Sequence, residues 1–293
     1  MSAPIIGFIG LGLMGQAFTR RLAQSGYSVA GYDIVAEKVA AAAAHGVQAC
    51  TSPAEVAHTA DIILLSLTTT AAMEEVVLGT DGISAAARLR GKVLVDHSTT
   101  EIENTQRVAA SLATKCGMSF VDAPVSGGPA AAANGTLAIM AGGEKEAIAR
   151  IKPIMERLGC FTHMGPVGSG QATKLVNQTL VLANYCVIAE GLRLAEAYGV
   201  DAAKIPAALA AGHAGSNLLP VLFERMIARD FAPRGYARQV VKDLEMLHQA
   251  AGARHLAMPM AAQALTLFRL LIAQGKSELD GASILTLYPE PTS

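Results

Sequence analysis

A lysine and two amide side chains lie at a spacing that suits proton transfer to a bound molecule. Lys174, Asn177 and Gln178 are three and four residues apart, so on a helix they share one face. A lysine there can take up and return a proton if its pKa falls from about 10.4 toward neutrality, which burial beside a cation promotes. The same spacing equally fits a solvated lysine in the first turn of a helix.

These residues stand at the start of a long helical pattern, residues 168–199. Gly168 and Gly170 punctuate its start, Gly199 fits a C-terminal cap, and no proline interrupts it. At 1.5 Å per residue such a helix spans on the order of 40 Å, so we predict that it joins two domains. Its uncharged part, residues 175–189, is shorter than the ~20 apolar residues of a membrane span and contains amides, so no membrane partner is predicted.

A second set of residues predicts dinucleotide binding. The apolar run 5–9 precedes Gly10-Leu11-Gly12-Leu13-Met14-Gly15 and a helical pattern, the strand-turn-helix context of a GxGxxG motif. The first glycine allows a tight turn, the second lets a pyrophosphate approach the backbone, and the third lets the helix pack on the strand. Asp33 follows the next apolar run, where an acid binds the ribose hydroxyls and repels a 2′-phosphate. Since no arginine follows before Arg88, we predict NAD rather than NADP.

Two later strand ends are expected to add cofactor contacts, because ligands bind at the carboxyl ends of the strands in an open α/β sheet. The apolar runs 61–67 and 92–96 precede them. The residues assigned to the cofactor here are Leu67, Thr68, Ser98 and Thr99. The alternative is that each serves as a helix cap, and Thr100 with Glu103 is expected to form a capping box.

A Ser-Gly-Gly loop follows the apolar strand at 120–123. In Ser126-Gly127-Gly128, adjacent glycines let backbone N–H groups converge on an anion, and the serine adds a hydroxyl. Such a loop suits a carboxylate, and an ordinary tight turn is the alternative.

Strand and helix patterns alternate up to residue 164, which predicts an α/β fold with a doubly wound, Rossmann-type parallel sheet. After Gly199 only helical patterns follow. We therefore predict a dinucleotide-binding domain over residues 1–164 and an all-helical substrate and oligomerisation domain over residues 165–293, joined by the long helix. That helix is apolar on more sides than one domain need cover, which suggests subunit packing. The residues concerned are Leu182, Tyr185, Cys186, Ile188 and Ala189.

Composition narrows the class of partner. The chain has 293 residues, of which 52% are apolar, enough for about two domains with a sizeable core. Its 23 basic and 24 acidic residues form no basic block, so no nucleic-acid partner is predicted. Four scattered cysteines and an amino terminus without a signal pattern predict a cytoplasmic protein. The histidines show no ligand spacing, so no metal site is predicted.

Three motifs in order resemble the β-hydroxyacid dehydrogenase family: GLGLMG, DAPVSGG with GTLAIMAGG, and GSGQATKLVNQ. The likeness covers nearly the whole chain and implies a homodimer or homotetramer. It implies that Lys174 is the catalytic residue and that Asn177 binds substrate. It also implies that the loop 126–128 holds the substrate carboxylate and that Lys242, beside Asp243, borders the nicotinamide.

The residues after the lysine bear on the substrate. The 6-phosphogluconate dehydrogenase branch has His-Asn where this chain has Asn177-Gln178, whereas Asn-Gln is similar to tartronate semialdehyde reductases and Arg238 to hydroxyisobutyrate dehydrogenases. We therefore expect an NAD-dependent oxidoreductase that interconverts a small 3-hydroxy acid and its semialdehyde, of the 3-hydroxyisobutyrate or the tartronate semialdehyde/glycerate type. The alternatives are an NAD-binding sensor without turnover, an NADPH-dependent semialdehyde reductase and an imine reductase. Imine reductases lack the lysine, so Lys174 argues against that last alternative.

Overall fold

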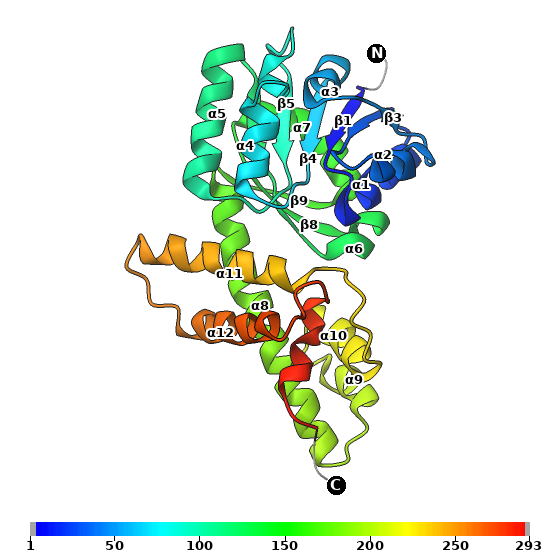
Figure 1. The fold of residues 1–293 in the computed structure, drawn as a ribbon, viewed down its shortest axis with the longest axis vertical. Coiled ribbons are helices and arrows are strands. Elements are labelled where there is room, and N and C mark those ends of the chain that lie inside the picture. Colours follow the sequence, from blue (N-terminus) through cyan, green and yellow to red (C-terminus); the bar gives the residue numbers. More distant parts are fainter. Residues whose placement is uncertain (1–3, 291–293) are drawn as a thin grey trace. The chain divides into compact units, whose positions relative to one another are not determined.

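The computed structural model describes residues 4–290. The chain divides into two compact units, unit 1 up to Lys174 and unit 2 from Leu175 onward. The division falls inside a long helix, whereas the sequence placed a boundary at residue 164. Unit 1 is the α/β part of the ribbon in Figure 1, coloured blue to green, and unit 2 consists of the helices that follow.

Unit 1 is built on a sheet whose strand order is β3-β2-β1-β4-β5-β6-β8-β7, with β9 paired to β8. The strands are β1 (Ile6–Ile9), β2 (Val29–Tyr32), β3 (Gln48–Ala49), β4 (Ile62–Leu65), β5 (Val93–Asp96), β6 (Ser119–Asp122), β7 (Val125–Ser126), β8 (Leu137–Gly142) and β9 (Gly159–Gly165). Strands β1 to β6 pair in parallel, which confirms the doubly wound sheet. Strand β8 runs antiparallel to β6 and β7, an arrangement that the sequence reading did not predict. The connection from β7 to β8 is short, and a parallel crossover needs a dozen or more residues.

Helices cover both faces of this sheet (Figure 1). They are α1 (Leu13–Gln24), α2 (Ala36–Ala43), α3 (Pro53–Thr59), α4 (Thr70–Leu78), η1 (Ile83–Ala85), α5 (Ile102–Cys116), α6 (Gly128–Asn134) and α7 (Lys145–Leu158). In β4, Ile62 and Leu64 join one core cluster, with side chains of α1 and α7. Ile63 and Leu65 join the other, with side chains of α3, α4 and α5. The strand is therefore apolar throughout because both of its faces are buried.

The expected capping box at Thr100 and Glu103 was wrong. Helix α5 has Glu101 at its N-cap and no side-chain cap bond. The buried hydroxyl of Thr100 bonds instead to Asp96 at 3.3 Å and to Thr105 at 3.0 Å. A cap motif is a local pattern, and here Asp96 at the end of β5 and Thr105 within α5 are the partners of the hydroxyl.

Helix α8 (Ser169–Ala197) is the long helix predicted from the sequence. Its length and hydropathy alone would suffice for a membrane span, a test that core helices of soluble proteins also pass. The residues that the sequence assigned to subunit packing are mostly buried by the chain itself: Leu182, Cys186, Ile188 and Ala189 are at most 8% exposed. The apolar side chains that α8 exposes are others, namely Val176, Leu180, Val187 and Leu194. Sequence periodicity shows that several sides are apolar but not which side the neighbouring helices cover.

The described part of unit 2 contains helices and no strands. After α8 come η2 (Ala202–Lys204), α9 (Ile205–Leu209), α10 (Leu218–Ile227), α11 (Ala237–Gly252), α12 (Pro259–Ala273) and η3 (Gly281–Leu287). The last predicted helix is thus a 3₁₀ segment.

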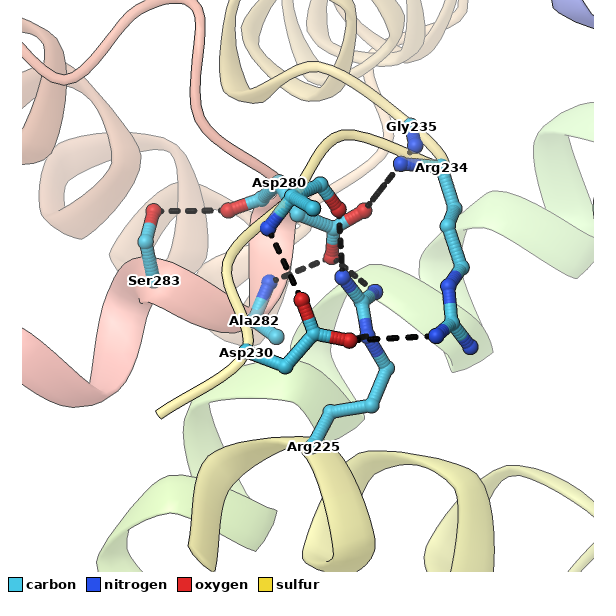
Figure 2. A network of polar contacts seen from close by, with 8 residues as sticks. Arg225, Asp230, Arg234, Gly235, Asp280, Ala282 and Ser283 are labelled. Atoms are coloured by element: carbon cyan, nitrogen blue, oxygen red, sulfur yellow. Dashed lines mark hydrogen bonds and ion pairs between the residues drawn. The ribbon is translucent and has the colours of Figure 1, made fainter. Parts of the chain in front are cut away.

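A buried ion pair fixes the segment that leads into α11 (Figure 2). Arg225 on α10 lies 2.7 Å from Asp280, and both side chains are at most 5% exposed. The Asp280 carboxylate also accepts the backbone N–H groups of Arg234, Gly235 and Ala282. One carboxylate therefore joins α10, the loop before α11 and the start of η3.

Candidate functional site

The glycine-rich loop after β1 contains glycines of two kinds. At Gly10, which has φ +93°, a Cβ would lie 2.2 Å from the Ser66 carbonyl oxygen, and at Gly15 it would lie 2.0 Å from that of Gly10. The packing of the chain itself requires these two glycines. At Gly12 a Cβ would meet no atom within 4 Å, so no contact within the chain requires a glycine at this position. Gly12 is also the N-cap of α1 and supplies no side-chain cap, which leaves N–H groups at the helix start for an anion.

Asp33, at the end of β2, is bound to this loop. Its Oδ2 accepts the N–H of Leu11 at 2.8 Å, and its Oδ1 accepts that of Val35 at 2.9 Å. A surface pocket of about 470 Å³ opens beside the carboxylate. Its lining residues are Tyr32, Asp33, Ile34, Ala36, Val39, Ala40, Ala43, Ala49 and Cys50. Lys38, which the sequence reading did not single out, places its Nζ 3.6 Å from Asp33 Oδ1. These residues are therefore suited to holding a dinucleotide, and the Lys38 ammonium group lies beside the carboxylate that would bind its ribose.

Two of the four strand-end residues predicted for the cofactor are joined by a hydrogen bond. Leu67 donates its N–H to Ser98 Oγ at 2.8 Å, and Ser98 is itself 3% exposed. Thr68 is exposed and Thr99 half-buried. The hydroxyl of Ser98 thus holds the segment after β4 against the end of β5.

Asp122, at the end of β6, caps the start of α8. Its two carboxylate oxygens accept the N–H groups of Gly168 and Gln171, each at 2.8 Å. A Cβ on Gly142 or Gly170 would come within 2.5 and 2.8 Å of these oxygens, so the carboxylate is closely enclosed. Burial raises the pKa of Asp122 to about 7, although the two N–H bonds act in the opposite direction.

Gln171 links the same helix start to the end of β5. Its amide donates to the Ser98 carbonyl at 2.8 Å and accepts the N–H of Thr100 at 3.1 Å, and the residue is 1% exposed. The sequence reading missed both Asp122 and Gln171. The available signal was the position of Asp122 at a strand end and of Gln171 in the first turn of the long helix.

Lys174 lies one turn after Gln171 and reaches the Ser-Gly-Gly loop. Lys174 is 7% exposed, and its Nζ donates to the Val125 carbonyl oxygen at 2.7 Å. Val125 directly precedes Ser126, which is half-buried. Gly127 and Gly128 have φ values of +129° and +71° and lead into α6, conformations that other residues rarely adopt. The Lys174 ammonium group therefore lies against the residue that directly precedes a Ser-Gly-Gly loop. Such a set of groups can bind a carboxylate and exchange a proton.

In unit 2, the other predicted site residues form a row of polar contacts. Asn177 Nδ2 donates to Gln178 Oε1 at 2.9 Å, and Gln178 Nε2 donates to Asp243 Oδ2. Lys242 Nζ lies 3.0 Å from Asp243 Oδ1. Arg238, one turn before Lys242, instead pairs with Glu278 at 2.9 Å. Among residues 4–290, no group of three or more His, Cys, Asp or Glu residues is arranged to hold a metal ion.

The fold and site define a class. A doubly wound sheet with a glycine-rich loop and an acidic residue after the next strand, together with a buried lysine beside a Ser-Gly-Gly loop, is typical of a dinucleotide-dependent oxidoreductase.

Comparisons with known proteins specify the family. The family of the NAD-binding domain of 6-phosphogluconate dehydrogenase matches residues 5–165, and that described as NAD-binding of NADP-dependent 3-hydroxyisobutyrate dehydrogenase matches residues 168–288. The 2-hydroxy-3-oxopropionate reductase of Escherichia coli (strain K12) is 36% identical, over 96% of this chain and 95% of that protein. The chain therefore belongs to the β-hydroxyacid dehydrogenase family, and it is an oxidoreductase.

Solved structures agree with the fold. A 3-hydroxyisobutyrate dehydrogenase from Salmonella typhimurium matches with a TM-score of 0.87 at 26% identity, covering 97% of this chain and 99% of that one. The Mycobacterium tuberculosis 3-hydroxyisobutyrate dehydrogenase, in a structure with L-serine, matches with a TM-score of 0.84 at 29% identity, covering 98% and 100%. The family resemblance and fold class inferred from the sequence are confirmed.

Proposed function

We propose that this chain is an NAD-dependent dehydrogenase that interconverts a small 3-hydroxy acid and its semialdehyde, of the 3-hydroxyisobutyrate or the tartronate semialdehyde/glycerate type. The observation that carries the proposal is the 2.7 Å contact between Lys174 Nζ and the carbonyl oxygen of Val125. It brings a proton-exchanging group to the loop that would hold the acid. The names of the similar proteins, a 2-hydroxy-3-oxopropionate reductase and two 3-hydroxyisobutyrate dehydrogenases, support this substrate class.

Each residue has a defined part in this proposal. Ser126, Gly127 and Gly128 bind the substrate carboxylate, and Asn177 binds the substrate from the next turn of α8. When bound, the nicotinamide accepts or supplies the hydride. Lys174 takes the proton of the substrate hydroxyl in oxidation and returns it in reduction.

The cofactor would be held by the glycine loop, by Asp33, by the strand ends and by Lys242. The residues proposed are Gly10, Leu11, Gly12, Leu13, Met14, Gly15, Asp33, Leu67, Thr68, Ser98, Thr99 and Lys242. Asp33 favours NAD because a carboxylate repels a 2′-phosphate. Lys38, 3.6 Å from Asp33, favours the second candidate, NADP, which the printed description of one matching family also names.

The remaining sequence expectations stand as proposals. Residues 1–164 bind the dinucleotide, and residues 165–293 serve substrate binding and assembly into a homodimer or homotetramer. The protein works in the cytoplasm with reduced thiols, and its four cysteines are free in the structure. It needs no nucleic-acid or membrane partner.

The test is a panel of small hydroxy acids and semialdehydes, including 3-hydroxyisobutyrate, glycerate, tartronate semialdehyde and L-serine, with nicotinamide absorbance followed for NAD and for NADP. We expect turnover of at least one 3-hydroxy acid with NAD preferred. Binding of NAD without turnover of any compound would instead favour a sensor, and equal use of both cofactors would remove the assignment of Asp33 as the discriminating residue.

A Ser126→Ala variant tests the carboxylate loop. Loss of one hydrogen bond to a charged group costs about 1.5 to 3 kcal/mol, so the KM for the acid should rise about 10- to 100-fold. The Kd for NAD should stay near normal, because Ser126 belongs to β7 and not to the glycine loop. An equal loss of NAD affinity would move Ser126 to the cofactor site. The matched control is Ser25→Ala, which removes a hydroxyl that donates to the Arg21 carbonyl oxygen at the end of α1.

A further inference from the structure

Four polar side chains of unit 2 form a continuous row from α8 to α11. Asn177 donates to Gln178, Gln178 donates to Asp243, and Asp243 uses its other oxygen on Lys242. Gln178 is only 7% exposed, and the Asp243 side chain is 13% exposed. The middle of the row, Gln178 and Asp243, therefore lies largely out of water, where a polar group without a partner is costly.

The donors and acceptors of the row can pair in only one orientation of the two amides. The Asp243 carboxylate, paired with Lys242, only accepts hydrogen bonds, so Gln178 must turn its NH₂ group toward it. The carbonyl of Gln178 then faces Asn177, and because a carbonyl also only accepts, Asn177 must turn its own NH₂ group toward Gln178. The orientation of both amides thus follows from a carboxylate two residues along the row.

We propose that Gln178 is a positioning residue, anchored by Asp243, that fixes the amide orientation of Asn177 for the substrate. The terminal torsion of an asparagine is broad and roughly two-fold, so an unanchored amide exchanges the places of its oxygen and nitrogen. With one N–H held by Gln178, Asn177 keeps its carbonyl oxygen and its second N–H in constant places. A hydroxyl group, which both donates and accepts, complements such an amide.

This inference rests on the proposed function, since it takes Asn177 to bind the hydroxy acid. The row itself can be tested without any substrate. In ¹⁵N-labelled protein, Asp243→Ala should shift the side-chain amide signals of Asn177 as well as those of Gln178, although Asp243 contacts only Gln178 of the two. Glu245→Ala, on the same helix but paired with Arg269, should leave both sets unchanged. Unmoved Asn177 signals in Asp243→Ala would overturn the proposal.

Catalysis supplies the second test, at saturating cofactor. Gln178→Glu sets a carboxylate against Asp243 and should lower kcat/KM for the hydroxy acid about tenfold or more. Adding Asp243→Asn to this variant gives position 243 an NH₂ group that donates to the carboxylate at position 178. The carboxylate at position 178 still accepts a hydrogen bond from Asn177. The double variant should therefore recover to within about threefold of normal.

The outcomes separate this proposal from the function on which it rests. No recovery in the double variant, or no loss in Gln178→Glu, would overturn the positioning role while the unmodified enzyme still turns over its substrate. If the unmodified protein turns over no hydroxy acid, the proposed function fails, and the amide signals still decide whether the row exists. A merely structural role would lower stability without giving the recovery.

Discussion

The ammonium group of Lys174 donates to a carbonyl oxygen one residue before the Ser-Gly-Gly loop. A side chain that is 7% exposed and fixed at both ends of its stem has little freedom to move. It can therefore hold a proton at one place, which a general acid/base requires.

Lys174→Ala should lower kcat by about 10²- to 10⁴-fold, the usual cost of removing a positioned general acid/base. NAD affinity should stay within about twofold, because the glycine loop and Asp33 are untouched. Lys174→Arg should not recover the rate, since a guanidinium keeps its proton. Steady-state kinetics and calorimetric cofactor titration check this, with the exposed Lys115→Ala as control. A Lys174→Ala enzyme within tenfold of normal would contradict the assignment.

His97 is a buried residue outside the proposed chemistry, and its titration should contribute to how stability depends on pH. Its Nδ1 lies 2.7 Å from the Ala123 carbonyl oxygen, and its ring stacks on Phe18 with centroids 4.9 Å apart. Burial lowers the pKa of His97 from 6.5 to about 4, partly opposed by that hydrogen bond. Between pH 6.5 and about pH 4 the unfolded chain therefore binds a proton at this histidine that the folded chain does not bind. Stability is lost as the pH falls through this range.

His97→Phe should remove this dependence while keeping a ring on Phe18. Between pH 7 and pH 4 the unmodified protein should lose about 3 kcal/mol of unfolding free energy relative to the variant. Asp122, whose pKa is raised, contributes with the opposite sign in the same range, and it cancels in the comparison. Urea unfolding at pH 7, 5.5 and 4 measures the difference. Two parallel stability curves would show that His97 does not titrate in this way.

At the scale of elements, the start of α8 is held by the ends of two strands. Asp122 at the end of β6 caps it, and Gln171 joins it to β5 through Ser98 and Thr100. Lys174 stands one turn further along. Strand ends thus set the place of the start of α8. In unit 2 the carboxylate of Asp280 does the same for the loop before α11 (Figure 2).

Asp122→Asn should weaken this cap, because an amide has one oxygen and the two N–H groups of Gly168 and Gln171 need two acceptors. One buried N–H left without a partner costs about 1 to 3 kcal/mol of stability. Since Lys174 loses its fixed place, kcat should fall at unchanged NAD affinity. Thermal unfolding and kinetics measure both effects. Asp61→Asn, which alters an exposed carboxylate beside β1, is the control and should leave kcat unchanged. A normal kcat in Asp122→Asn would show that Asp122 has only a structural role.

At the scale of the whole molecule, α8 exposes apolar side chains along one side. Val176, Leu180, Val187 and Leu194 are between 52% and 62% exposed. Their spacings of four and seven residues place them on one face of the helix. This face, and not the buried one assigned from the sequence, supports the proposed assembly.

Replacing Leu180 and Leu194 together by lysine should convert the proposed dimer or tetramer to monomers, because charges on this face would have to be desolvated on assembly. Sedimentation velocity measures the state of both proteins. Leu256→Lys, an equally exposed leucine outside α8, should leave the assembly intact. The idea fails if the unmodified protein is monomeric or if the double variant still assembles.

Much of the dinucleotide half followed from local patterns in the sequence. The GxGxxG motif after an apolar run, an acid at the next strand end and the alternation of strand and helix identified the fold, because each pattern is set by neighbours in the chain. The long helix was also predicted nearly to its ends, since glycines mark both. The motifs resembling the β-hydroxyacid dehydrogenases identified the family, which the comparisons confirm.

Tertiary structure alone decided how the site is held together. Asp122 meets Gly168 and Gln171 across 46 and 49 residues, and Gln171 meets Thr100 and Ser98 across 71 and 73. The antiparallel β8 and the side of α8 that its neighbours cover were likewise not predicted. Such pairings depend on strand order and on which helix faces are buried, and a periodic pattern reports only that a face is apolar. The sequence therefore identified Lys174 as the candidate acid/base, and the tertiary structure determined which residues hold it in place.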